Sequence, residues 1–246
     1  MATRRITFEG PCNFRDLGGY PTIDGGETRW GRLYRSDSMH TITATDLPVL
    51  RELGVRTAID FRSNFELDQI GIGPLGEVSM THVHCPTFDM NPNGEAPFVG
   101  GSAATFYARM MESGAPAYVA AATAIADADS MPAVFFCMAG KDRTGVFAAM
   151  VLGLVGVPDD VIVADYALTH EVLPTIAQRR EAREATASMR IRWEDIPDDL
   201  KGAHSHVMEE LLAMVQERWG GWDGYAKALG FPDDVVASLR AQLVDT

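Results

Sequence analysis

The chain has 246 residues, of which 46% are hydrophobic and 22% charged, and this length and composition suit a folded protein with a sizeable core. The formal net charge of −13 argues against nucleic acid or an anionic membrane as a bulk partner. Three cysteines do not make a disulfide framework, and no metal-ligand spacing is present, so we expect no bound metal. We expect a single domain over residues 1–246, with a helical C-terminal part over residues 159–246.

The first residues, Met1 to Phe8, lack the apolar core of a signal peptide, and no apolar run in the chain is long enough to span a bilayer. We therefore expect a cytoplasmic protein. Export by a route that leaves no signal peptide stays open.

The first informative stretch is Asn-Phe-Arg-Asp-Leu-Gly-Gly at residues 13–19, which is typical of a loop with two charged residues and a glycine hinge. The segment Gly31–Ser36 predicts a short strand. For Arg15, Asp16 and Arg35 two interpretations are open: contact with a ligand, or an ion-pair cluster that braces a functional loop from behind. We favour the cluster, because buried arginines and aspartates usually pair.

The segment from Arg56 to Arg62 predicts an apolar strand that runs into Asp-Phe-Arg-Ser, and Glu66 follows on the next helix. Charged residues at the carboxyl end of a strand in an α/β sheet lie where ligands bind. Arg62 is therefore a candidate substrate-binding residue. A salt bridge from Arg62 to Asp60 or Glu66 is an equally good alternative.

The segment from Val78 to Cys85 predicts the next strand, with His82 and His84 on one face. No third metal ligand has the right spacing, so we favour histidines that are exposed or satisfied by hydrogen bonds. A loop rich in glycine, proline and asparagine follows, up to Gly101. Asp89 stands at the head of this loop, where an Asx turn or a helix cap is the structural alternative to a catalytic role.

Other helices are predicted from apolar periodicity and from capping residues. They cover residues 45–53 (with Thr43 or Thr45 as the N-cap), 105–111, 116–128, 160–169, 174–188, 205–219, 222–229 and 233–243.

The stretch from Pro132 to Gly145 reads Pro-Ala-Val-Phe-Phe-Cys-Met-Ala-Gly-Lys-Asp-Arg-Thr-Gly. Its apolar and aromatic run, Ala133–Phe136, predicts a buried strand. A tight turn that starts with Cys137 comes next, and Val146–Val157 predicts a buried helix. The sequence therefore places a thiol at the end of a strand, opposite the N-terminus of a helix.

Such a turn is suited to binding an anion. Successive backbone N–H groups form a concave surface, and the helix dipole adds partial positive charge. The planar fork of Arg143 matches two phosphate oxygens at once. The same positive field favours the thiolate form of Cys137, which is the nucleophilic form. A nucleophile inside a phosphate-binding loop predicts a phosphatase.

The helix predicted at 174–188 is polar and rich in arginine. Its arginines, with two that follow it, either attract anionic ligands or form a solvated face with neighbouring glutamates, and we favour the solvated face. The residues concerned are Arg179, Arg180, Arg183, Arg190 and Arg192, with Glu181 and Glu184.

The string from Cys137 to Gly145, which contains Cys-x5-Arg-Thr, resembles the signature of the cysteine-dependent protein tyrosine phosphatase superfamily. Lys141 and Asp142 within it are similar to the loop residues of the bacterial atypical, MptpB-like branch. The motifs at residues 13–19, 31–36 and 60–66 resemble that branch as well. The resemblance implies an α/β fold with a central, mostly parallel sheet of about four or five strands, flanked by helices.

The resemblance also implies a reaction, the hydrolysis of phosphate monoesters through a phosphocysteine intermediate. The implied substrates are phosphotyrosine, and also phosphoserine, phosphothreonine or phosphoinositides, so the partners are a phosphorylated protein or a phosphoinositide, with inorganic phosphate as product. No metal or cofactor is implied, because the loop and Arg143 take the place of one. Asp89 occupies the position of the family's general acid, and Asp142 is the alternative acid.

The residues implied by the resemblance fall into two groups. The catalytic group is Cys137, Arg143, Asp89, Asp142 and Thr144. The substrate-binding group is Met138, Ala139, Gly140, Lys141, Gly145 and Arg62.

One residue departs from the family pattern, because Phe136 stands where histidine usually precedes the nucleophile. That departure keeps a second function class open, a catalytically weak module that binds phosphate or phosphoinositides. A pure binder needs Arg143 but not Cys137, and both are present together with Thr144, so catalysis is favoured. A rhodanese-like sulfurtransferase has no need of Arg-Thr at the start of the helix and ranks below both.

Overall fold

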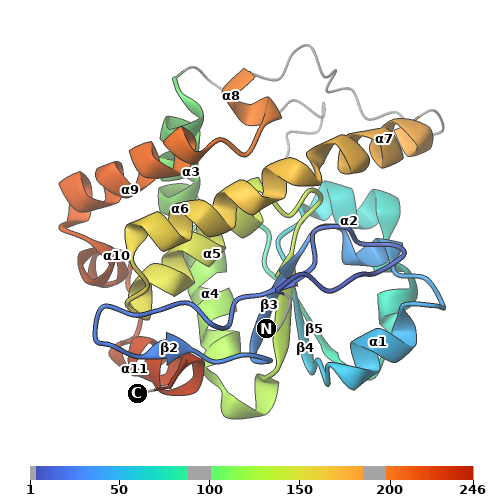
Figure 1. The fold of residues 1–246 in the computed structure, drawn as a ribbon, viewed down its shortest axis with the longest axis horizontal. Helices are drawn as coiled ribbons and strands as arrows, with labels where there is room; N and C mark the ends of the chain where they lie inside the picture. Colours follow the sequence, from blue (N-terminus) through green and yellow to red (C-terminus); the bar gives the residue numbers. More distant parts are fainter. Residues whose placement is uncertain (1–3, 88–100, 185–197, 246) are drawn as a thin grey trace.

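The centre of the molecule is a five-stranded sheet with the strand order β1-β3-β6-β4-β5 (Figure 1). The computed structural model describes residues 4–87, 101–184 and 198–245. The strands are β1 (Arg15–Asp16), β3 (Leu33–Ser36), β6 (Ala133–Phe136), β4 (Thr57–Asp60) and β5 (Thr81–His84). All neighbours are parallel except β1, which pairs with β3 in the antiparallel direction. The predicted α/β fold with a mostly parallel sheet is confirmed.

Helices surround this sheet, and most of the chain beyond β6 is helical (Figure 1). They are α1 (Leu47–Glu52), α2 (Asn64–Ile70), α3 (Ala103–Ser113), α4 (Ala115–Ala126), α5 (Asp142–Leu154), α6 (Asp159–Ala167), α7 (Leu173–Glu184), α8 (Asp198–Lys201), α9 (Ser205–Trp219), α10 (Trp222–Ala228) and α11 (Asp233–Leu243). Within the described ranges, none of these helices combines the length and the apolar character needed to cross a membrane.

Two separate hydrophobic cores cover the two faces of the sheet. Because side chains alternate along a strand, Ile59 and Phe135 join the larger core with α3 to α6 and α9 to α11. Ala58 and Val134 face the smaller core, which includes Leu50 of α1. Figure 1 shows α1 and α2 on one side of the sheet and α4 and α5 on the other. With both faces covered, the carboxyl ends of the parallel strands are where a ligand can approach.

The C-terminal end of the described chain pairs with an N-terminal strand in a small second sheet. Strand β2 (Glu27–Thr28) pairs in the antiparallel direction with β7 (Val244–Asp245), so the segment that follows the last helix, α11, is joined to β2 (Figure 1). That the whole chain forms one domain stays a prediction.

Several helices lie close to their predicted positions, and α9 and α11 have the predicted bounds. Helix α1 differs, because Asp46 occupies its N-cap position instead of Thr43 or Thr45. The Asp46 carboxylate accepts hydrogen bonds from the backbone N–H groups of Glu9, Gly10 and Thr43. This aspartate therefore joins the N-terminal segment to the start of α1, a long-range role that local sequence does not reveal.

Helix α5 begins four residues earlier than predicted, at Asp142. An acidic residue in the first turn is favourable beside the helix dipole, and this offsets the weak helix propensity of the Thr-Gly pair that follows Arg143. As a result, Arg143 and Thr144 lie on the first turn of the helix and not in the turn before it.

Candidate active site

Three parallel strands end level with one another at the carboxyl edge of the sheet. Ser36 of β3 is in register with Phe136 of β6, which is in register with Asp60 of β4. Cys137 follows β6 directly and is 2% exposed. The central strand therefore delivers the predicted nucleophile between the segments that follow its two neighbours.

The loop of residues 137–143, called the signature loop below, turns sharply at Gly140. This glycine has a φ of +63°, and a Cβ atom there would lie 2.4 Å from the carbonyl oxygen of Ser36. A side chain is therefore excluded twice, by the left-handed backbone conformation and by the close approach of β3.

The carbonyl groups of the signature loop are held from outside by three side chains. Ser38 Oγ donates to the Met138 oxygen (2.6 Å), Asn13 Nδ2 to the oxygens of Ala139 (3.3 Å) and Gly140 (3.2 Å), and Arg35 Nη2 to the Gly140 oxygen (2.8 Å). In a trans peptide unit the N–H points away from the C=O. Drawing the carbonyls outward therefore leaves the N–H groups to the concave side, where an anion binds.

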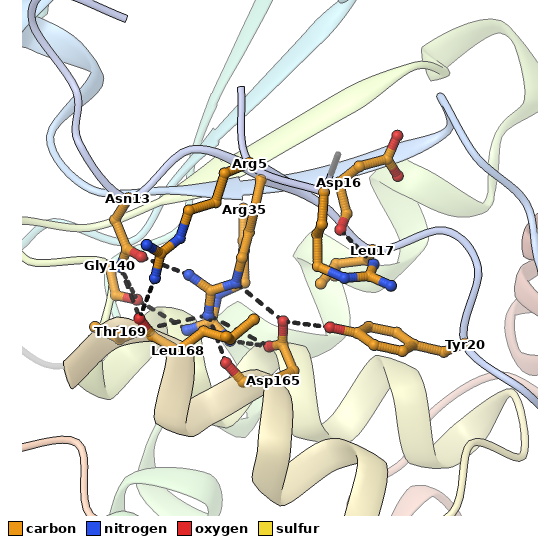
Figure 2. A network of polar contacts seen from close by, with 12 residues as sticks. Arg5, Asn13, Asp16, Leu17, Tyr20, Arg35, Gly140, Asp165, Leu168 and Thr169 are labelled. Atoms are coloured by element: carbon orange, nitrogen blue, oxygen red, sulfur yellow. Dashed lines mark hydrogen bonds and ion pairs between the residues drawn. The ribbon is translucent and has the colours of Figure 1, made fainter. Parts of the chain in front are cut away.

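Behind the loop, two buried arginines share one buried aspartate, Asp165, and Figure 2 shows it with Arg35 and Tyr20. Asp165 of α6 accepts hydrogen bonds from Arg15 Nε (2.9 Å) and Tyr20 Oη (2.8 Å) through Oδ1, and from Arg35 Nη1 (2.5 Å) through Oδ2. Burial raises the pKa of Asp165, but the two guanidinium groups outweigh burial and hold that pKa well below its usual range. The ion-pair cluster predicted for Arg15 and Arg35 is confirmed.

The acidic member of the cluster was not the predicted one. Asp16 accepts instead from the backbone N–H groups of Gly18 (2.7 Å) and Gly31 (2.8 Å), and so closes the loop that precedes β3. Asp165 lies 150 residues from Arg15 in sequence. Only the tertiary fold, in which α6 packs against α5, brings the two together.

Asp165→Asn is expected to lower the free energy of unfolding by about 3–5 kcal/mol, because it leaves two buried guanidinium groups without their counter-charge. The folded chain holds the pKa of Asp165 below its unfolded value. Its stabilisation is therefore present above about pH 4 and is lost as pH falls through the folded pKa. Urea unfolding at several pH values checks this, with the exposed Asp223→Asn as the control. Equal stability of the two variants would contradict the shared ion pair.

Arg143 is held in place by Glu66 of α2. Its Nη1 donates to Glu66 Oε2 (2.5 Å) and to the Phe61 carbonyl (3.1 Å), and its Nη2 donates to Glu66 Oε1 (2.9 Å). A complete capping box between Ser63 and Glu66 fixes the carboxylate at the start of α2. Burial alone would lower the pKa of Arg143, but Glu66 and Cys137 outweigh it and raise that pKa. The guanidinium is therefore a fixed cation beside the loop.

The structure thus brings together a thiol at the end of a strand, a loop whose carbonyl oxygens are bound by side chains, and a guanidinium fixed on the next helix. Residues 6–245 match the model of the tyrosine phosphatase family. The chain belongs to that family.

Relatives span the chain. Triple specificity protein phosphatase PtpB of Mycobacterium tuberculosis is 26% identical over 281 residues, which cover 99% of this chain and 100% of that protein. A tyrosine-protein phosphatase of Nostoc commune is 26% identical over 226 residues, covering 85% of this chain and 73% of that protein. The solved core catalytic domain of the PP-IP phosphatase Siw14 of S. cerevisiae has 14% identity and a TM-score of 0.41, and the match covers 76% of this chain and 100% of that one. The family and the two curated relatives confirm the phosphatase resemblance.

Two other residues of this phosphatase, Lys141 and Asp142, contact each other. Lys141 is 4% exposed; its ammonium donates to the carbonyl of Leu200 in α8 and lies 3.4 Å from Asp142 Oδ1. The expected contact of Lys141 with substrate would therefore compete with two existing partners. Thr144, next on α5, has a buried hydroxyl with no hydrogen-bond partner among the described residues.

Two of the predicted substrate-binding residues have structural partners instead. Arg62 is fully buried, and its Nε and Nη2 donate to the carboxylate of Asp60 at 2.6 to 3.0 Å. Of the alternatives, the salt bridge to Asp60 is therefore the one observed, since Glu66 pairs with Arg143. The N–H of Gly145 donates to the Lys141 carbonyl (2.7 Å) inside α5, which takes it away from a bound phosphate. This geometry favours a packing role for both residues.

Both histidines of β5 have hydrogen-bond partners. His82 Nε2 lies 3.2 Å from Asp60 Oδ2, and His84 Nε2 lies 2.7 Å from the Arg62 carbonyl. The favoured interpretation as satisfied histidines is confirmed.

Some predicted site residues fall beyond the described ranges. Asp89, the expected acid, lies outside them, and so do Arg190 and Arg192. Arg179 donates to the backbone carbonyls of Glu9 and Gly10, so it anchors the N-terminal segment to α7. The side chains of Arg180 and Arg183 are also outside the described residues, so the favoured solvated face stays a prediction.

Proposed function

We propose that this phosphatase hydrolyses phosphate monoesters in two displacements at the signature loop. In the first, the Cys137 thiolate attacks phosphorus and the bond from phosphorus to the ester oxygen breaks, which leaves a phosphocysteine. Arg143 and the loop amides stabilise the charge on the equatorial oxygens in the transition state. Asp89 gives a proton to the leaving oxygen.

In the second displacement, water attacks the phosphocysteine and the P–S bond breaks, which releases inorganic phosphate and restores the thiolate. Asp89 now takes the proton from the attacking water. The buried hydroxyl of Thr144, without a partner among the described residues, suits a donor to the departing thiolate. No metal or cofactor enters this scheme.

One observation carries the proposal furthest, the outward anchoring of the loop carbonyls by Ser38, Asn13 and Arg35. A buried cysteine with a purely structural role has no need of three polar side chains to set the loop that follows it. Amides that already point at the bound phosphate stabilise the transition state most, because they need no rearrangement when negative charge develops there.

Phosphotyrosine in proteins is the first substrate to test, followed by phosphoserine, phosphothreonine and phosphoinositides. The triple specificity in the name of the M. tuberculosis relative supports testing more than one class. We keep the cytoplasm as the expected setting from the sequence.

A catalytically weak phosphate-binding module is the alternative, and Phe136 is the observation that favours it. This residue is fully buried, belongs to the smaller core, and lies with its ring 5.7 Å from the Arg62 guanidinium. Its side chain therefore offers no hydrogen bond to the loop. Substrate turnover separates the two functions, because a module of this kind binds inorganic phosphate without releasing it from an ester.

The test is the pH–rate profile of aryl phosphate hydrolysis by the wild type and Asp89→Asn. We expect the wild type to turn over and the variant to lose about 10²–10⁴-fold in kcat, because the leaving group is no longer protonated. The acidic optimum should also disappear. No turnover by the wild type would favour the binding module. Unchanged kcat in Asp89→Asn would move the acid to another residue.

A further inference from the structure

The side chain of Asn13 connects the signature loop to the buried groups behind it. Asn13 is 1% exposed, and its Nδ2 donates to the carbonyls of Ala139 (3.3 Å) and Gly140 (3.2 Å). The same nitrogen donates to Oγ1 of Thr169 (3.3 Å), a residue that follows α6 in the chain (Figure 2). Two of its three acceptors are thus consecutive carbonyls of the loop, at the sharp turn.

Arg15 determines which way the Asn13 amide faces. Its Nη1 lies 2.5 Å from Asn13 Oδ1, and its Nε pairs with Asp165 at 2.9 Å. A guanidinium only donates, so the Asn13 atom that faces it must be the oxygen, and the NH2 group must face the loop. The main chain is fixed as well, because the Asn13 N–H donates to Asp37 Oδ1 at 2.9 Å. Both parts of Asn13 are therefore oriented by buried partners that lie outside the loop.

The two carbonyls matter because of the N–H groups that belong to the same peptide units. The Ala139 carbonyl shares a peptide unit with the N–H of Gly140, and the Gly140 carbonyl shares one with the N–H of Lys141. Arg35 supports the Gly140 carbonyl as well, at 2.8 Å. Asn13 thus sets the direction of two successive amides, and successive amides form the concave surface that suits an anion. If either peptide unit turned over, a carbonyl would face the phosphate and repel it.

We propose that Asn13 is a positioning residue for the reaction, which keeps the loop in its phosphate-binding form and is itself oriented by Arg15. This inference rests on the proposed function, because it concerns the same loop. Asn13 acts through the amides of the loop and not on the phosphate directly. Fixed amides contribute most where charge develops in the transition state, so the loss of Asn13 should reduce kcat/KM more than the affinity for inorganic phosphate.

The decisive variant is Asn13→Ala, which removes the donors without adding a charge. Binding of inorganic phosphate, measured by calorimetry on folded protein, should weaken about tenfold, and kcat/KM for an aryl phosphate should fall about 10²-fold. Asn13→Asp should lose at least as much, because a carboxylate of similar shape still accepts from Arg15 but cannot donate to the loop carbonyls. Wild-type phosphate affinity in either variant would overturn the inference.

Tyr20→Phe is the matched control. Tyr20 is buried and its hydroxyl donates to Asp165 Oδ1 at 2.8 Å, so the change removes one buried hydrogen bond behind the loop without altering a contact of the loop itself. This variant should lower the melting temperature but keep phosphate affinity and kcat/KM. An equal loss of affinity in Tyr20→Phe would trace the effect to general stability and overturn the role of Asn13. If Asn13→Ala does not fold, Asn13→Asp decides, since it keeps a partner for Arg15.

The role of Arg15 is tested by a double-variant cycle. Arg15→Lys keeps the positive charge, but its single ammonium has no fork to hold both Asp165 and Asn13. It should weaken phosphate binding in the wild-type background and have little further effect in Asn13→Ala. An equal loss of affinity in both backgrounds would show that Arg15 does not act through Asn13.

The two measurements separate this inference from the proposed function. If the wild type binds phosphate but hydrolyses no ester, the proposed function fails, and the comparison of phosphate affinities still decides the role of Asn13 in shaping the loop. If the wild type hydrolyses the aryl phosphate and Asn13→Ala does so with unchanged kcat/KM, the inference fails and the proposed function stands.

Discussion

Cys137→Ser should reduce hydrolysis of an aryl phosphate by about 10⁴-fold or more while inorganic phosphate still binds. A serine hydroxyl is a much weaker nucleophile than a thiolate, so the first displacement loses its nucleophile. The anion-binding parts, the loop amides and Arg143, are unaltered by the change. Turnover and phosphate affinity are measured on the same preparations. For Cys137→Ser we therefore expect turnover to be lost and phosphate affinity to be kept.

The other two cysteines provide the matched controls. Burial, followed by the nearby Asp60, raises the pKa of Cys85 to about 11, and burial, followed by Asp37, raises that of Cys12 to about 12. Neither thiol supplies a thiolate at neutral pH, so Cys85→Ser should retain turnover. Full turnover by Cys137→Ser would eliminate the phosphocysteine mechanism and would require a different nucleophile.

The central part of the fold could be predicted because local and tertiary signals agree there. The apolar run Ala133–Phe136 is buried on both sides, so strand propensity and core packing favour the same structure. Helix α9 shows its apolar stripe over fifteen residues and ends at Gly220 in the left-handed conformation. Short strands were harder to predict from the sequence. Strand β1 has two residues, and its position depends on pairing with β3.

The site could be predicted only where its functional residues lie close together in sequence. Cys137 and Arg143 share one loop, so their spacing is visible in the sequence. The partner of Arg143 was missed, because Glu66 lies 77 residues away and its capping position at α2 gives no hint of a second partner. Glu66 was instead considered as a partner for Arg62, which is nearer in sequence.

The supports of the loop show the same limit. Asn13 was visible as part of a motif, yet its two hydrogen bonds to the loop carbonyls span 126 and 127 residues. Ser38 had no signal in sequence, because its contact with the Met138 carbonyl follows from the register of β3 against β6. Long-range hydrogen bonds between buried polar groups are therefore the part of this site that a single sequence does not specify.

Arg143→Lys should reduce kcat/KM for an aryl phosphate by about 10³-fold, and it should weaken inorganic phosphate binding as well. Lysine keeps the positive charge but has no planar fork, so it neither orients two phosphate oxygens nor matches both oxygens of Glu66. The loss of binding distinguishes this variant from Cys137→Ser, in which the anion-binding parts remain. Steady-state kinetics and calorimetry with phosphate measure the two effects.

Glu66→Gln shows whether the charge or the orientation of Arg143 matters more. The change keeps the shape of the side chain and leaves the guanidinium intact, but it removes the carboxylate that accepts from Nη1 and Nη2. If orientation is decisive, Glu66→Gln should lose activity in the same direction as Arg143→Lys but by a smaller factor, since one amide oxygen still accepts. Wild-type kcat/KM in Glu66→Gln would mean that the loop itself fixes Arg143. In that case the first turn of α5 alone would fix the orientation of the Arg143 guanidinium. The ion pair with Glu66 of α2 would then contribute to the stability of the fold but not to catalysis.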